Sequence, residues 1–235
     1  MTAPAKLLAE QLTVTTGCRV TAALPEEAGW RIRYERSESQ GELFARALLL
    51  TPPVPQILDL LEGQADRLRS DRLELLSRLR YRPTIALLIR LNGLSPLEPP
   101  GYDRPGGDPV LYWVADNRQK GVSPPEAGPA LTIHGRPDFS EAMYDSPEEE
   151  VIEAIMARFF EQYPERGRYE VAATQLKKWR YARPIHPAPE RTYLINRPEI
   201  APAAVAGDAF GGARVEGAYL SGIAAAELLE AELSR

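Results

Sequence analysis

The chain has 235 residues and a formal net charge of −5, with 44% hydrophobic and 26% charged residues, as in a globular protein. This length suits one large domain or two small ones, and the acidic balance argues against nucleic acid or an anionic membrane as a partner. One cysteine excludes an intrachain disulfide, and two histidines leave too few ligands for a zinc site, so no metal is predicted. Without an apolar run of roughly 20 residues or a signal-peptide layout, we expect a cytoplasmic protein.

The N-terminal part predicts a short helix in PAKLLAEQL and then a meander of three strands. The expected strands cover residues 19–23, 30–36 and 44–50. The third ends in the apolar run ALLL, which indicates burial on both faces. Two helices follow, one from an early proline to Gly63 and one over residues 66–80.

The middle of the chain predicts a separate antiparallel sheet. The segments TIALLIRL, VLYWVADN, ALTIHG and RYEVAATQLKKW are predicted to be strands and are divided by loops rich in proline and glycine. Between the third and the fourth, a helix is expected to begin near Pro147, where a serine, a proline and three glutamates form an N-terminal signature. We expect this helix to cover the sheet.

The C-terminal stretch AVAGDAFGGARVEGAYLSGIAAAELL predicts a strand, a glycine turn and a helix that opens on small residues. Helix N-termini carry free N–H groups and partial positive charge, and glycines allow close backbone approach. The layout therefore suits a phosphate-bearing cofactor, although small residues also serve tight packing alone. Asp208, in the turn, either caps local N–H groups or accepts hydrogen bonds from sugar hydroxyls.

The motif GDAFGGARVEGAYLSGIAAAELL resembles the C-terminal flavin motif of the amine oxidase and protoporphyrinogen oxidase superfamily, in the form found in renalase-like bacterial proteins. Similar segments cover nearly the whole chain, among them LTVTTGCRVTAALPEEAGWRI, ALLLTPPVPQILDLL, WVADNRQKG, LTIHGRPDFSEAMYD and LKKWRYARP. The resemblance implies an α/β (α+β) fold with an incomplete FAD-binding, Rossmann-like domain and an antiparallel-sheet substrate domain with helical cover. It implies that residues 1–52 and 190–235 belong to the FAD domain and residues 53–189 to the substrate domain.

The resemblance also implies residue roles. Asp208 would bond the ribityl–pyrophosphate region of FAD, and backbone at the start of the last helix would meet the isoalloxazine edge. Val20 would touch adenine, and the end of the third strand would lie near the cofactor. The implied cofactor-binding residues are Val20, Thr51, Pro52, Asp208, Val215, Glu216, Gly217 and Ala218.

The primary FAD grip of that superfamily, an N-terminal unit with G-x-G-x-x-G, is not found in these residues. We therefore expect a split gene with a separate nucleotide-binding chain, a longer reading frame, or a scaffold that has lost flavin. This chain alone is expected to hold FAD weakly. The small-residue side of the last helix would invite a partner chain or a homo-oligomer.

On the substrate side, Trp179 and Arg180 are the residues expected to act in catalysis on a small molecule. An aromatic plane beside a cation suits a flat dihydropyridine with attached phosphates, but a core tryptophan beside a rim arginine is the other interpretation. His134 and His186 could each touch substrate or be ordinary core or loop residues, and Cys18 is expected to be a core thiol.

The resemblance implies hydride transfer from a dihydronicotinamide-type or amine substrate to FAD, with reoxidation by oxygen. The cofactor would carry the chemistry and the protein would orient the reactants, so no general base is required. The alternative is a non-catalytic binding or partner subunit that has lost flavin.

Overall fold

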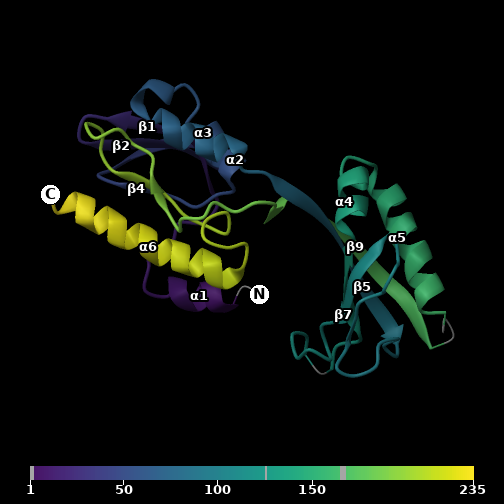
Figure 1. The fold of residues 1–235 in the computed structure, drawn as a ribbon. Helices are drawn as coiled ribbons and strands as arrows, with labels where there is room; N and C mark the ends of the chain where they lie inside the picture. The colour runs from purple at the N-terminus through teal and green to yellow at the C-terminus, as the bar shows by residue number, and fades with distance from the viewer. Residues whose placement is uncertain (1–2, 125, 165–167) are drawn as a thin grey trace. The chain divides into compact units, whose positions relative to one another are not determined.

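The computed structural model describes residues 3–124, 126–164 and 168–235. The chain divides into two compact units, one formed by residues 1–79 and 186–235 and the other by residues 80–185 (Figure 1). The sequence placed the first boundary after residue 52, but the structure keeps the two helices that follow with the first unit. Their attachment is long-range: the Arg69 N–H donates to the Ile195 carbonyl at 2.9 Å, and Arg197 Nε donates to the Leu68 carbonyl at 3.1 Å.

The first unit contains two three-stranded sheets, with strand orders β1-β2-β3 and β10-β11-β4. In the second of these, β11 runs parallel to β4 and antiparallel to β10. The elements of this unit are α1 (Ala3–Ala9), β1 (Cys18–Glu26), β2 (Gly29–Arg36), β3 (Ser39–Ala45), β4 (Leu48–Leu50), α2 (Val54–Leu60), the 3-10 turn η1 (Ala65–Arg67), α3 (Ser70–Arg78), β10 (Tyr193–Leu194), β11 (Ala203–Val205) and α6 (Val215–Leu233).

The expected third strand of the meander is split between the two sheets. Its first residues end β3, where Ala45 pairs with Trp30, and its last three form β4 beside β11. The ladder with β2 stops there because β2 begins at Gly29, so the apolar run continues against the buried residues of β11 instead. Burial on both faces is not observed, since β4 lies at a sheet edge and Leu49 is 37% exposed.

The second unit has one five-stranded sheet of order β6-β7-β8-β5-β9, in which every pairing is antiparallel. The four expected strands therefore lie in one sheet, as predicted. Its elements are β5 (Tyr81–Gly93), β6 (Tyr102–Asp103), β7 (Leu111–Asp116), β8 (Ala130–Gly135), α4 (Pro137–Met143), α5 (Glu148–Gln162) and β9 (Tyr169–Pro184).

Helix α5 covers one face of this sheet, as the sequence predicted. Three glutamates occupy its first turn, where negative charge complements the helix dipole. Val151, Ile155 and Phe159 recur every four residues and are fully buried in one cluster with the apolar side chains of β5, β7 and β8. Helix α4 joins the same cluster through Phe139 and Met143. Both helices thus pack on the same face of the sheet.

The buried carboxylate of Asp108 fixes the loop before β7 to α5. Its side chain is 3% exposed and accepts hydrogen bonds from the N–H groups of Val110 and Leu111, at 2.8 and 2.7 Å. Arg158 of α5 donates to it from Nε and Nη2, at 3.1 and 2.8 Å. Burial alone would raise the pKa of Asp108, but these donors outweigh it and hold the pKa below its ordinary value.

We predict that Asp108→Ala destabilises the 80–185 unit by about 2–4 kcal/mol, because it leaves two N–H groups and a guanidinium without their acceptor. Asp145→Ala is the matched control: that carboxylate is 84% exposed, and its pair with Arg180 is expected to contribute about 0–1 kcal/mol. Urea unfolding followed by circular dichroism measures both. Equal midpoints for the two variants would contradict the assignment.

The same lowered pKa predicts an acid dependence. A carboxyl whose folded pKa lies below its unfolded value contributes stability that is complete above the unfolded value of 3.8 and is lost as the pH falls through the folded one. The difference between wild type and Asp108→Ala should shrink accordingly in acid.

In the described part of the chain, no helix combines the length and the apolar character needed to cross a membrane.

Candidate functional site

The carboxyl ends of β4 and β11 bring three of the predicted cofactor residues to one edge of a sheet. The two strands are parallel, with Val205 opposite Leu50, and the Ala206 N–H donates to the Leu50 carbonyl at 3.0 Å. A methyl group on Gly207 would lie 3.8 Å from the Thr51 carbonyl oxygen. Thr51 and Pro52 therefore follow one strand where Asp208 follows its neighbour, which is the edge at which open α/β sheets bind ligands.

The carboxyl group of Asp208 can accept more hydrogen bonds than it does in this structure. Its side chain is half-buried, and burial raises the pKa of the carboxyl, opposed by a hydrogen bond from its own backbone N–H. Within the described residues, no other group donates to it. Gly207 precedes it with φ of 143°, a conformation that favours glycine, so the turn directs the chain out of β11 at this point.

A buried serine holds this turn in place. Ser221 of α6 is fully buried, and its hydroxyl accepts the Gly207 N–H at 3.0 Å while donating to the Arg191 carbonyl. One side chain thus connects the end of β11, the helix that follows it and the segment leading into β10. The sequence indicated only that Ser221 belongs to the small-residue side of the helix. A hydroxyl in an otherwise apolar stripe was the available signal.

The first turn of α6 carries the four remaining residues of the predicted cofactor contact at the C-terminus, residues 215–218. Arg214 is the extended residue before the helix. Its carbonyl accepts the Ala218 N–H at 3.0 Å, so the N–H groups of residues 215–217 are those without a partner inside the helix. A Cβ on Gly217 would overlap the Gly212 carbonyl oxygen, so only glycine allows the preceding loop to lie against the helix. Val215 is 70% exposed. This 19-residue helix presents an accessible N-terminus with partial positive charge.

Val20 lies elsewhere in the first unit. It belongs to the β1-β2-β3 sheet, at a register shift opposite β2, and is 41% exposed. Its predicted contact with adenine stays a prediction. Cys18, expected in the core, is only half-buried at the start of β1.

The second unit presents an open sheet face opposite its helices. Side chains alternate along β5, and since Ile85 and Leu87 enter the core, Ala86 points to the other face. Ala86 pairs with Lys177 on one side and His134 on the other. The next strand continues this row, because Trp113 is the partner of His134.

Trp179 lies on the same open face, two residues beyond Lys177, and is 53% exposed. At the far edge, Tyr102 stacks on Trp113 with centroids 4.8 Å apart, and the Arg104 guanidinium lies 5.0 Å from the Trp113 ring. The sequence missed Tyr102 and Arg104, because a two-residue strand inside a proline- and glycine-rich loop has no periodicity to detect. The face therefore has one exposed indole, that of Trp179 near Lys177, and at its edge a Trp113 ring that Tyr102 and Arg104 already cover.

His134 is electrically neutral at neutral pH on this face. Burial lowers its pKa, and the positive charge of Lys120 lowers it further. A neutral imidazole offers one donor and one acceptor without adding charge.

Arg180 does not join Trp179. Neighbouring residues of a strand point to opposite faces, and Arg180 bonds Asp145 at 3.0 Å while stacking on Tyr144 at 4.4 Å. The predicted pairing of this cation with the tryptophan is therefore not formed. His186, outside this sheet, is exposed in the first unit.

The family model for flavin containing amine oxidoreductase matches residues 1–229. The chain belongs to this family. The observed α/β fold with antiparallel sheets agrees with the expectation from the C-terminal flavin motif.

Several solved structures share this fold. A protoporphyrinogen oxidase candidate from Exiguobacterium is 19% identical, with a TM-score of 0.63 over 93% of this chain and 47% of its own. An oxidoreductase from Methanosarcina mazei is 21% identical, with a TM-score of 0.59 over 90% of this chain and 49% of its own. Cyclohexylamine oxidase from Brevibacterium oxydans is 14% identical, with a TM-score of 0.58 over 92% of this chain and 49% of its own. The chain thus spans about half the length of these proteins.

For the serine that holds the turn, we predict that Ser221→Ala destabilises the first unit by about 1–3 kcal/mol, because the Gly207 N–H and the Arg191 carbonyl both lose their partner. Ser234→Ala, at the exposed end of the same helix, removes a comparable hydrogen bond and should cost about 0.5 kcal/mol or less. Chemical unfolding compares the two variants. Similar values for both would show that Ser221 only fills space.

Proposed function

We propose that this chain provides the cofactor-binding sheet edge and the substrate sheet of a flavin-dependent oxidoreductase. The observation that carries the proposal is the convergence of Thr51 and Asp208 at the carboxyl ends of two adjacent parallel strands, followed by the free N-terminus of α6. Membership of the flavin containing amine oxidoreductase family supports the same chemistry.

The residues at this edge fit FAD. Asp208 is a half-buried carboxyl without another donor among the described residues, so it is suited to the hydroxyls of a ribityl chain. The first-turn N–H groups of α6 favour partial negative charge, such as that of a flavin carbonyl edge. When bound, FAD would accept a hydride from the substrate and pass the electrons to oxygen.

The open face of the second unit is the proposed substrate surface. Trp179 offers an exposed plane for a flat, apolar substrate, and Lys177 stands on the same face, whereas the Trp113 ring is already covered by Tyr102 and Arg104. His134 holds its single proton without charge. We propose a substrate of the dihydronicotinamide type, as in renalase-like proteins, with an amine as the other candidate. The face needs to orient the donated hydrogen, not to remove a proton.

Tight FAD binding is proposed to require a nucleotide-binding segment outside these 235 residues. The sequence holds no G-x-G-x-x-G turn to supply converging N–H groups for the two phosphates, and each charge-assisted contact of that kind contributes about 1.5–3 kcal/mol. We expect the 235-residue chain alone to lose FAD on gel filtration. Adding a separately expressed nucleotide-binding segment should restore yellow protein.

In the complete flavoprotein, Asp208→Ala should weaken FAD binding by about 1–3 kcal/mol, because it removes an acceptor at a half-buried site. Asp66→Ala is the matched control, since that carboxylate is 80% exposed in η1. Flavin fluorescence titration measures both affinities. An unchanged affinity in Asp208→Ala would reject the assigned contact. A protein that stays colourless with every nucleotide-binding segment would reject flavin function and favour the non-catalytic subunit.

Measurements of kcat/KM should distinguish the roles of Trp179 and Arg180, which are neighbours in β9. Trp179→Ala is expected to lower kcat/KM by about two- to tenfold, since a stacking surface on the open face is lost. Arg180→Ala should leave kcat/KM near the wild-type value, because this guanidinium is engaged by Asp145 and Tyr144 on the other face. Steady-state assays with dihydronicotinamides and amines make the comparison. The reverse order of effects would show that Arg180, not Trp179, contacts substrate.

A further inference from the structure

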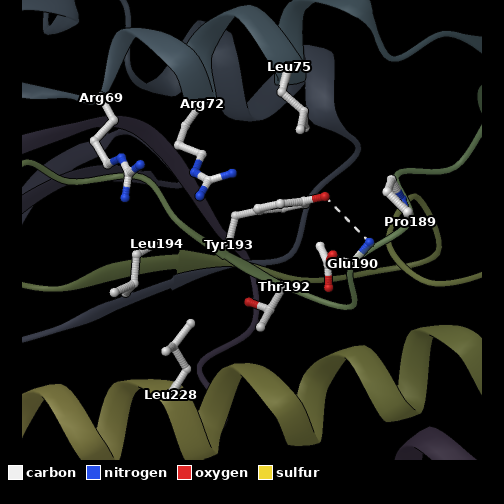
Figure 2. A pocket seen from close by; sticks show the side chains of 9 residues that line it. All are labelled: Arg69, Arg72, Leu75, Pro189, Glu190, Thr192, Tyr193, Leu194 and Leu228. Atoms are coloured by element: carbon white, nitrogen blue, oxygen red, sulfur yellow. Dashed lines mark hydrogen bonds between the residues drawn. The ribbon is translucent and has the colours of Figure 1, made fainter.

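A pocket of about 510 Å³ lies in the first unit between α3, α6 and the segment that enters β10 (Figure 2). This volume is in the range of about 300–1,000 Å³ typical of small-molecule sites. Leu75, Leu194 and Leu228 supply apolar walls from three different elements. None of the predicted cofactor or substrate residues lines the pocket, so it is separate from the site of the proposed function.

Arg72 provides the buried polar atom of this pocket that lacks a hydrogen-bond partner. Its guanidinium lies 4.8 Å from the centroid of the Tyr193 ring, above the ring face as Figure 2 shows, which fixes its orientation. Its Nε is buried, and among the described residues it is the one buried side-chain nitrogen or oxygen without a hydrogen bond. This nitrogen has almost no accessible surface, whereas the Arg72 side chain as a whole is 28% exposed, so a ligand would meet the guanidinium through its outer nitrogens.

The neighbouring charges select the kind of acceptor. Asp71 lies 3.5 Å from Arg72 Nε without hydrogen-bond geometry, and its carboxylate is taken by Arg69 through two hydrogen bonds of 3.1 and 2.9 Å. Arg69 and Arg72 therefore share one carboxylate, which leaves this cluster of three residues with a net charge of +1. The Glu190 carboxylate also lines the pocket, which disfavours a second negative charge.

The remaining polar groups are largely occupied. Thr192 donates its hydroxyl to the Val205 carbonyl at 2.8 Å, and the Tyr193 hydroxyl accepts the Glu190 N–H at 3.4 Å, drawn as a dashed line in Figure 2. The pocket therefore combines the Arg72 guanidinium with apolar walls and the Glu190 carboxylate. A compact dianion would gain one ion pair and meet one repulsion, whereas an apolar monoanion also fills the leucine-lined space.

We propose that this pocket binds a small organic monoanion, whose carboxylate pairs with Arg72 and whose apolar part lies between the leucines of α3, β10 and α6. Such a ligand would connect α3 to α6 and would stabilise the first unit independently of flavin, because binding to the folded state alone shifts the unfolding equilibrium.

An NMR titration of the 235-residue chain with hexanoate tests the proposal, with 1-hexanol and inorganic phosphate as comparison ligands. Hexanoate should bind saturably with Kd on the order of 1 mM. The alcohol has the same apolar body without the charge, and phosphate has the charge without the body, so both should bind about tenfold more weakly or worse. Equal binding of hexanol, tighter binding of phosphate, or no saturation by hexanoate would each overturn the proposal.

Variants assign the site. Arg72→Gln should weaken hexanoate binding about tenfold, whereas Arg78→Gln, on the same helix but exposed and paired with Glu74, should leave it unchanged. Glu190→Gln alters an exposed residue and should tighten binding a few-fold by removing the repulsion, which keeps the test decisive if Arg72→Gln fails to fold. Wild-type affinity in folded Arg72→Gln, an equal loss in Arg78→Gln, or weaker binding in Glu190→Gln would contradict the assignment.

Discussion

The cofactor-side geometry of this chain depends on a single buried hydroxyl. Ser221 joins the Gly207 N–H to the Arg191 carbonyl, and through these two bonds the turn after β11, the helix α6 and the approach to β10 are fixed to each other. The strands involved are only two and three residues long, so their own ladders supply few hydrogen bonds. Without the bridge, the position of Asp208 relative to the start of α6 would be set mainly by packing of small alanine side chains.

In the second unit, successive side chains of β9 point to opposite faces of the sheet and have different roles on each face. Along β9, Lys178 and Arg180 bind the α4–α5 connection, with Lys178 Nζ donating to the carbonyls of Tyr144 and Ser146 at 2.9 and 2.6 Å. Lys177 and Trp179 point to the open face. The same four-residue sequence therefore both anchors the helical cover and furnishes the aromatic surface, which leaves that surface rigidly supported.

The sequence predicted what local patterns encode. The four strands of the large sheet and the start of α5 follow from alternation, from proline- and glycine-rich loops and from glutamates in a first turn. The C-terminal strand, turn and helix were also predicted, because a short apolar run, a glycine turn and helical spacing of apolar and small residues mark them in sequence. The opposite orientation of Trp179 and Arg180 was also available from strand alternation, although the predicted pairing overlooked it.

Long-range contacts could not be predicted from these patterns. The assignment of α2 and α3 to the first unit depends on bonds from Arg69 and Leu68 to residues more than one hundred positions later. The break between β3 and β4 depends on where β2 begins, and the pocket around Arg72 requires three segments that only the fold assembles. Periodicity indicates the type of a segment and which of its sides is exposed. It does not indicate which distant segment covers the buried side.

The glycines of α6 look equivalent in the sequence, yet the structure gives them different tolerance to variation. A side chain on Gly217 would collide with the Gly212 carbonyl, whereas a Cβ on Gly222 would meet nothing within 4 Å. Any alanine at position 222 would also favour the helix, since glycine is about 1 kcal/mol worse than alanine in a helix interior. A search pattern for distant relatives should therefore require glycine at position 217 and accept other small residues at position 222. In the C-terminal motif, position 217 therefore requires glycine, and position 222 tolerates other small residues.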